Sequence, residues 1–504
     1  MGQETHRRRR LRLLAVVLLG VAAAGCGSTV PLASQQDLSQ GGALGSGTGS
    51  TSSDAGPAGV GSGGVASPGV GSAGAGTAAG GAAASSTGPA TGAGSSAETA
   101  TGTRVVQAKA PIVVGIPYVD QQQSNSLTSS VGTGLNSADD KAIYNVLLKR
   151  LNARGGILGH KVVPLFHAVD VTQNEADYSA AACADFTQDH HVDIIFVAGD
   201  QALDKCAMKA GVAVVGADMS TQNSADYARL GYVQQPDAIA LDDLARLQAR
   251  EFTAMGLFAS PAPAKVGVLY YEEPHFVAAE KILESELAKR GVQVVKREAF
   301  HYVASSQDVG QTESQIGNAV LSFRSAGVTQ VVGVETNAWL IGFFGVHAES
   351  QHYYPRYGYT SDEVLTNISA NVSAQELKNS VFIGWMPAYD TADTRQYTPE
   401  GRACLKLMTD DGQDMSTGNE RFSALDDCDN LGFLTAALTA GGDRISRDSL
   451  RVGGRAIGTS YRPAGTFLTN FPHGYGAGAA AIRRGKFDDA CACFAYTSAP
   501  QRTG

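Results

Sequence analysis

Lysine, arginine and aromatic residues are absent from residues 27–103 of this 504-residue sequence. The same 77 positions hold 21 of the 60 glycines and only three charged residues, Asp37, Asp54 and Glu98. A stretch of this composition buries too little apolar surface to offset its chain entropy. We therefore predict a disordered Gly/Ser/Ala-rich tether over residues 26–109 and a folded domain over residues 110–498.

The chain also lacks an excess of basic residues. Its formal charge at pH 7 is −9, and without the first 25 residues it is −13, from 34 basic and 47 acidic side chains. Proteins that bind nucleic acid or anionic lipid surfaces typically carry a basic patch or stripe. The composition therefore argues against nucleic acid as a partner, and against contact with a membrane surface through charge.

Motifs for cofactor, metal and catalytic chemistry are missing as well. No Walker loop occurs in residues 104–504, and Gly132-Thr133-Gly134 lacks the third glycine of a dinucleotide fingerprint. His347 and His352 are five residues apart, so they do not share a helix face as the zinc motif His-Glu-x-x-His requires. No nucleophile stands with a base and an orienting group. We predict no cofactor, no metal site and no enzymatic activity.

The N-terminus has the pattern of an export signal over residues 1–25. Arginines at 7–10 and 12 precede an apolar run from Leu13 to Ala24, which is too short to span a membrane. The small residues Ala23-Ala24-Gly25 lead directly to Cys26, and this arrangement resembles the lipobox of bacterial lipoproteins. The resemblance implies an acylated Cys26 and an extracytoplasmic protein that is anchored by lipid to the outer face of the cell membrane. An ordinary secretory peptide with a chance cysteine is the alternative.

Six further cysteines remain, an even number that suggests disulfides in an exported chain. Several pairings are open, of which we favour the local one: Cys183 with Cys206, Cys404 with Cys428, and Cys491 with Cys493. Zinc is the rival interpretation, but no histidine lies at ligand spacing from these cysteines.

Short runs rich in valine and isoleucine alternate with amphipathic segments through the folded region. Continuous apolar runs are typical of parallel strands that are covered on both faces. We predict an α/β fold of parallel sheets flanked by helices, in two lobes, with a β/α barrel as the alternative. The predicted strands are Ile112–Pro117, Lys161–Val169, Val192–Val197, Val212–Gly216, Val266–Tyr271, Val292–Phe300, Thr329–Val334, Tyr357–Thr360 and Val381–Trp385.

Helices are predicted between these strands, among them 237–255, 275–290 and 308–326. The helix after the first strand should begin with Ser137 as its N-cap, with Asp139 and Asp140 in its first turn, where the helix dipole favours negative charge. Gly155-Gly156 should end it.

The segment Asn152-Ala153-Arg154-Gly155-Gly156-Ile157-Leu158-Gly159, between a helix and a strand, resembles a signature of the Leu/Ile/Val-binding proteins of ABC importers. Glu272-Glu273-Pro274-His275-Phe276 and Ala326-Gly327-Val328-Thr329 follow in the same order as in that family. The resemblance implies the two-lobed periplasmic-binding-protein type I fold with three hinge crossovers. One lobe would be about 110–235 and 366–458, and the other about 236–365 and 459–498.

That family captures a small solute between its lobes and passes it to an ABC permease. The resemblance therefore implies a monomeric solute-binding lipoprotein whose ligand is a small polar molecule, either an amino acid or an amide-, polyol- or amine-like solute. A ligand-sensing or partner-binding envelope lipoprotein is the main alternative. A secreted hydrolase on an α/β scaffold is a third hypothesis, in which Asp200 or Asp362 would act in turnover.

Ligand-binding residues are expected just past the strand ends, where loops and helix N-termini converge. In the first lobe these are Tyr118 with the long polar loop that follows it, Asp200, Gln201, Ser220 and Thr221. By the resemblance, the positions of Asp200 and of Ser220-Thr221 hold a ligand carboxylate in the amino-acid binders. Asp200 departs from that chemistry, which favours a neutral or cationic solute.

In the second lobe the expected ligand-binding residues are His275, Asn337 and Asp362. His275 lies where the family often has an aromatic residue at the edge of the cleft. Asn337 falls near the position at which the family has a tyrosine that contacts the ligand. Asp362 belongs to a segment that resembles the family segment whose acid binds the amino group of the ligand. A structural role is an open alternative for each of them.

Overall fold

The computed structural model describes residues 109–120, 122–123, 138–170, 172–196, 200–216, 219–303, 308–337, 339–442 and 444–504. They belong to one compact unit of the chain, residues 100–504. The predicted export signal, Cys26 and the tether lie outside the described residues. Most of the long loop after the first strand lies outside them too.

The first of two sheets has six parallel strands: β1 (Ile112–Val119), β2 (Val162–Val169), β3 (Ile194–Phe196), β4 (Ala213–Val215), β5 (Val233–Gln235) and β11 (Gly476–Ala477). Their order is β11-β5-β4-β3-β1-β2. The inner strands β3 and β4 consist of buried apolar residues only, as is typical of central strands in a sheet covered by helices.

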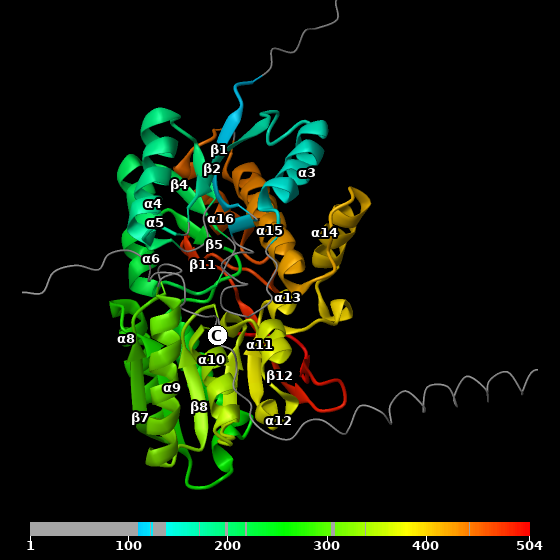
Figure 1. Cartoon of the computed structure of the whole chain (residues 1–504). Coiled ribbons are helices and arrows are strands. Elements are labelled where there is room, and N and C mark those ends of the chain that lie inside the picture. The colour runs from blue at the N-terminus through cyan, green and yellow to red at the C-terminus, as the bar shows by residue number, and fades with distance from the viewer. Residues whose placement is uncertain are drawn as a thin grey trace, which may run out of the picture. The chain divides into compact units, whose positions relative to one another are not determined.

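Two groups of helices cover this first sheet (Figure 1). One group is α4 (Glu175–Ala184), the π-turn η1 (Asp185–Asp189), α5 (Gln201–Ala210) and α6 (Ser224–Leu230). The other is α3 (Asp140–Ala153), α14 (Pro399–Asp410), α15 (Gly418–Gly441) and α16 (Arg447–Ile457). Each group packs its own apolar cluster against the strands.

The second sheet has a parallel core and an antiparallel edge. Its strands are β6 (Lys265–Tyr271), β7 (Gln293–Phe300), β8 (Gln330–Val334), β9 (Arg356–Thr360), β10 (Val381–Gly384), β12 (Ala481–Asp488) and β13 (Cys493–Tyr496), with β14 (Gln501–Arg502) paired to β12. The order is β13-β12-β10-β9-β8-β6-β7, in which β12 pairs antiparallel with β10 and β13 pairs antiparallel with β12.

Helices also surround the second sheet. They are α7 (Leu241–Ala254), α8 (Pro274–Lys289), α9 (Val309–Ala326), α10 (Trp339–Ser350), α11 (Leu365–Asn371) and α12 (Ala374–Leu377), with the short turns η2 (Leu257–Ala259) and η3 (Ser361–Glu363). The short helices α13 (Pro387–Asp390) and η4 (Thr394–Gln396) follow β10. Helix α7 packs on α8, and α10 packs on α9.

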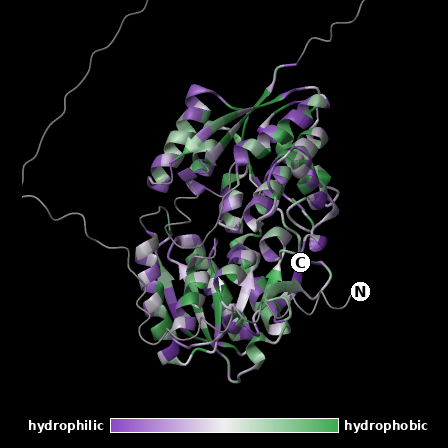
Figure 2. Ribbon diagram, turned by 45° about the vertical axis from the view of Figure 1, so that its right-hand side comes forward, coloured by the Kyte–Doolittle hydropathy of each residue, from purple (hydrophilic) through white to green (hydrophobic). Residues whose placement is uncertain are grey.

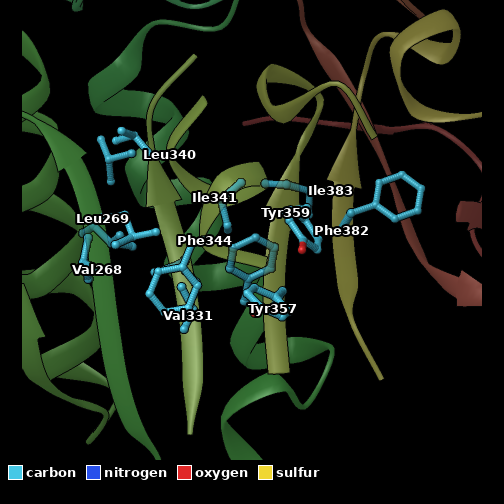
Figure 3. Packing of buried hydrophobic residues seen from close by; sticks show 14 of the residues in the cluster. Val268, Leu269, Val331, Leu340, Ile341, Phe344, Tyr357, Tyr359, Phe382 and Ile383 are labelled. Atoms are coloured by element: carbon cyan, nitrogen blue, oxygen red, sulfur yellow. The ribbon is translucent and has the colours of Figure 1, made fainter. Parts of the chain in front are cut away.

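The core of the second lobe is the larger apolar cluster. Figure 3 shows Phe344 of α10 beside Val331 of β8 and Tyr357 of β9, and all three side chains are fully buried. The colouring of Figure 2 shows apolar strands inside and polar residues on the outward helix faces. This is the pattern that continuous apolar strands and amphipathic helices predict.

All nine predicted strands correspond to strands of the structure, but the predicted lobe boundaries need correction. Strand β10 pairs with β9, so the chain stays in the second lobe to residue 384 rather than leaving it near 365. Strand β11 pairs with β5, so residues 459–477 still belong to the first lobe. The chain thus crosses between the sheets after β5, after β10 and after β11.

The predicted start of the helix after β1 is also wrong. Asp139, not Ser137, is the N-cap of α3, because its carboxylate accepts a hydrogen bond from the Ala142 amide at 3.0 Å. The two aspartates therefore lie two positions closer to the start of the helix than the sequence suggested, and Asp139 caps the helix and also faces its dipole.

The six cysteines form the local pairs predicted from the sequence, Cys183–Cys206, Cys404–Cys428 and Cys491–Cys493. The first pair joins α4 to α5 and the second joins α14 to α15. Each of these two closes a loop of about 25 residues, which is worth roughly 3 kcal/mol in the chain-entropy view. The third closes the tip of the β12–β13 hairpin.

Helices α15 and α16 approach so closely that glycine is required between them. A methyl group on Gly453 of α16 would overlap the carbonyl oxygen of Ala437 in α15. We expect Gly453→Ala to lower the free energy of unfolding by about 1–3 kcal/mol through overpacking, as measured by urea denaturation. Gly310→Ala is the control, because Gly310 has a helical backbone and open space around it. Gly412→Ala would not serve, because the φ of Gly412 is +86°. A Gly453→Ala protein as stable as Gly310→Ala would contradict the close packing.

Candidate ligand-binding site

The carboxyl ends of the parallel strands of the two sheets meet at contacts between the lobes. The Ser220 amide, past β4, donates to Asp362 Oδ1, past β9, at 3.0 Å. Thr336 Oγ1, past β8, lies 3.2 Å from the sulfur of Met219. A third contact joins Gln201 in α5 to His275 in α8. We call these six residues the seam. Ligands of open α/β sheets bind at such strand ends.

Ser220 and Asp362 form the most enclosed contact of the seam. Both residues are fully buried. The Ser220 hydroxyl accepts a hydrogen bond from the Ile239 amide at 3.1 Å, so this residue is also tied to the crossover after β5. Thr360 places Asp362 by capping the short turn η3, since its hydroxyl accepts from the Asp362 amide at 3.2 Å. The predicted ligand residues Ser220 and Asp362 therefore bind each other.

Asp200 acts as the N-cap of α5. Its Oδ1 accepts from the amides of Ala202 and Leu203 at 2.8 and 2.9 Å, and its Oδ2 accepts from the hydroxyl of Ser179. A carboxylate held by three donors of its own lobe is oriented along the helix axis and satisfies the first amides of α5. The carboxylate that the sequence singles out thus has a structural role in this lobe.

Gln201 and His275 form a neutral bridge between the lobes. The Gln201 side-chain amide donates to the Thr221 carbonyl oxygen at 3.1 Å and lies 3.1 Å from His275 Nδ1. Burial lowers the pKa of His275 to about 4, because the charged imidazolium would lose its hydration. The imidazole is therefore uncharged near neutral pH, where it can accept one hydrogen bond and donate one.

Carboxylates dominate the charge around this bridge. Burial, and then the negative charges of Asp200 and Glu273, raises the pKa of Glu175, in the first turn of α4, to about 7. Glu273 is the N-cap residue of α8, so the coupling runs between the two lobes. Lys205 offsets part of this charge. A region of this kind disfavours an additional anion.

A second group of carboxylates lies behind Asp362 in the second lobe. Glu335 accepts from the amides of Leu340 and Ile341 at 2.7 and 2.6 Å and so holds the start of α10. Burial raises its pKa to about 8. Burial, and then the charge of Glu335, raises the pKa of Glu363 well above its ordinary value.

Tyr118 and Asn337 lie at the margins of the site. The Tyr118 ring at the end of β1 packs edge-on against Phe166 at 5.9 Å, with Lys141 Nζ 5.3 Å from its centre. Asn337 is exposed, with a φ of +70°. The loop expected to complete the site lies largely outside the described residues.

Sequence reasoning missed Met219 and Asp237. Met219 directly precedes Ser220, so its place past β4 was the available signal. The backbone oxygen of Asp237, in the crossover after β5, accepts a hydrogen bond from Trp385 Nε1 at 2.7 Å. This bond joins the first crossover to the start of the second, and because it uses the backbone oxygen of Asp237, no side-chain pattern signals it.

A cavity of about 560 Å³ lies beside the crossovers, between α6, α7 and the segment around β11. Arg246 and Arg250 line it, but Arg246 is paired with Asp242 and Asp243, and Arg250 with Glu251. Their charges are thus compensated within the protein. Among the described residues, no helix is long and apolar enough to cross a membrane, and no group of three or more histidine, cysteine or acidic side chains is arranged to hold a metal ion.

Comparison with known proteins relates this architecture to transport proteins. No protein-family model and no curated protein sequence matches the chain. An ABC transporter substrate-binding protein from Desulfitobacterium hafniense in complex with Leu is 14% identical, with a TM-score of 0.52 over 77% of this chain and 100% of that chain. A fatty acid ABC transporter substrate-binding protein from Thermomonospora curvata is 12% identical, with a TM-score of 0.57 over 78% and 92%.

A solute-binding protein of an ABC transporter from Rhodopseudomonas palustris, in complex with p-hydroxybenzoic acid, is 13% identical. Its TM-score is 0.55 over 78% of this chain and 98% of that chain. These proteins share the overall fold with this chain at very low sequence identity. The chain therefore has the two-lobed α/β fold of the type I periplasmic binding proteins.

Proposed function

We propose that this protein is the extracytoplasmic solute-binding component of an ABC importer, anchored through Cys26. The observation that carries the proposal is the seam, where the carboxyl ends of two parallel sheets meet through Ser220 and Asp362. Three crossovers connect the lobes, and such connections let lobes close on a ligand by hinge motion. Transport proteins that share this fold at low identity support the same role.

The mechanism requires binding without covalent chemistry. A solute would enter between the lobes and contact the groups past β1, β3 and β4 on one side and past β6, β8 and β9 on the other. The neutral bridge of Gln201 and His275 and the Ser220–Asp362 contact would rearrange around it. Closure then presents a defined surface of both lobes to a permease, which makes delivery depend on the bound solute.

A thermal-shift screen of the whole protein tests this function. Amino acids, carboxamides, polyols, sugars and amines form the panel. A true ligand at about 100 times its Kd stabilises the folded state by about 2.7 kcal/mol. Gln201→Ala should weaken the binding of that ligand. Gln311→Ala, on the exposed face of α9, should leave the binding unchanged.

A deletion strain provides the independent readout. Uptake of the ligand found in the screen should fall when the gene is removed and return with the wild-type chain. Binding of a ligand without any loss of its uptake would instead indicate a sensor. If no compound of the panel binds and the deletion strain takes up all of them normally, the proposal is refuted.

A further inference from the structure

Three backbone amides at or beside the seam that could receive a ligand carboxylate are already used by carboxylates of the protein. The Ser220 amide donates to Asp362 Oδ1 at 3.0 Å. At the start of α5, the Ala202 and Leu203 amides donate to Asp200. Free backbone amides at strand ends and helix N-termini are the usual sites for a ligand anion. Here a ligand carboxylate would have to displace a side chain of the same charge.

The neutral side chains of the seam are engaged as well. The Thr336 hydroxyl is directed at the sulfur of Met219. The Gln201 amide donates to the Thr221 carbonyl oxygen, and the Ser220 hydroxyl accepts from Ile239. The donors of these three contacts are therefore occupied within the protein.

An acceptor oxygen near the seam makes the same point independently. Glu273 Oε2, two residues before His275 at the start of α8, is shielded from solvent and accepts no hydrogen bond within the part of the chain that the structure describes. Shielded acceptors without a donor are uncommon in folded proteins. A bound group that donates hydrogen bonds would satisfy this oxygen, and a carboxylate would not.

Two cations near the seam are already engaged with other groups of the protein. Of the nearby cations, Lys205 already acts on Glu175, and Lys141 lies over the rings of Tyr118 and Phe166. A ligand carboxylate would meet the carboxyl groups of Glu175, Asp200, Glu273 and Asp362.

We propose that this site takes solutes that donate hydrogen bonds from nitrogen, namely amines and carboxamides, and rejects free carboxylates, with Asp362 as the residue that excludes them. The inference rests on the proposed function. It separates this protein from the three structures above, whose stated ligands, leucine, a fatty acid and p-hydroxybenzoic acid, are all carboxylic acids.

Matched ligand pairs test the proposal at pH 7 on the full chain. Leucine is compared with leucinamide and isoamylamine, and p-hydroxybenzoate with p-hydroxybenzamide and p-hydroxybenzylamine. The amide or amine should raise the unfolding temperature and bind at least about tenfold more tightly than the acid in calorimetry. An acid that binds as well as its amide overturns the proposal and leaves the transport function intact. Binding confined to polyols or sugars also overturns the proposal and leaves the transport function intact. If no compound binds and a deletion strain takes up all of them normally, the transport function itself is refuted.

Two substitutions at position 362 separate charge from donor occupancy. Asp362→Ala frees the Ser220 amide and removes one negative charge, so the ratio of acid to amide affinity should rise by about tenfold. Asp362→Asn keeps an oxygen for the Ser220 amide while removing the charge, so it should raise the ratio of acid to amide affinity by less than Asp362→Ala does. It also keeps the proposal testable if the alanine variant does not fold. Asp414→Ala, an exposed carboxylate on the α14–α15 connection, is the control. An acid-to-amide ratio that is unchanged in both folded variants overturns the role of Asp362.

Discussion

Replacing Asp429 with alanine is expected to lower the free energy of unfolding by about 3–5 kcal/mol. This buried carboxylate of α15 accepts hydrogen bonds from the Tyr461 hydroxyl at 2.6 Å and from the amides of Ala464 and Gly465 at 2.7 Å. Alanine would leave both amides and the phenol without an acceptor in the interior. Urea unfolding of the variant and the wild type at pH 7 measures the loss.

Asp429 matters because it joins α15 to the chain near the crossovers. Its side chain also lies near that of Asp237, whose backbone oxygen accepts from Trp385. Asp429→Asn, which keeps one acceptor oxygen, should be affected less than Asp429→Ala. Asp414→Ala should change stability by less than about 0.5 kcal/mol, since it is an exposed surface change. Equal stability of Asp429→Ala and Asp414→Ala would show that the network contributes nothing.

Raising the pH from 6.5 to 8.5 is expected to destabilise the protein steeply. Burial raises the pKa of Asp204, Glu335 and Asp390 to about 8 in the folded state. In the unfolded chain these groups titrate near their ordinary values of about 4. The folded state therefore holds more protons between pH 4 and 8, and stability falls as the pH rises through this range.

His275 acts in the opposite direction but in a different window. Burial lowers its pKa from 6.5 to about 4, so the stability it contributes is fully present above pH 6.5 and is lost as the pH falls toward 4. Above pH 6.5, the pH dependence of stability that these four groups contribute comes from the three carboxyl groups alone. Each contributes a slope of up to about 1.4 kcal/mol per pH unit.

Urea unfolding at pH 6.5, 7.5 and 8.5 measures this slope. Asp390→Asn should reduce it, because the amide does not titrate while its oxygen can still accept from the Ser361 hydroxyl, which donates to Asp390 at 3.0 Å. Asp414→Asn should leave the slope unchanged. A free energy of unfolding that is constant or rising across these pH values would contradict the raised pKa values.

The fold was predictable where burial alone selects the residues. Continuous apolar runs identified the nine strands, since both faces of these sheets are covered. Strand β5 was missed because its sequence is Val233-Gln234-Gln235, two of whose three residues are polar. The Gln234 side-chain amide donates to the Gly474 and Leu450 carbonyl oxygens, a compensation between distant segments that no local pattern reveals.

The lobe boundaries were less predictable for a related reason. Whether β10 pairs with β9 or returns to the first sheet depends on neighbours across the sheet rather than on its own residues. For the site, the strand-end rule selected Gln201, Ser220, His275 and Asp362, which the structure brings together in two contacts. It could not foresee that Asp362 would take up the Ser220 amide, because that contact depends on how the lobes meet.

The bond between Trp385 and Asp237 gives the protein a built-in optical probe. The sequence contains only two tryptophans, and Trp385 is fully buried where the first two crossovers meet, whereas Trp339 begins α10 within one lobe. Any change in the angle between the lobes must alter the surroundings of that indole. Its emission therefore offers a label-free signal with which rates of opening and closing can be followed by rapid mixing.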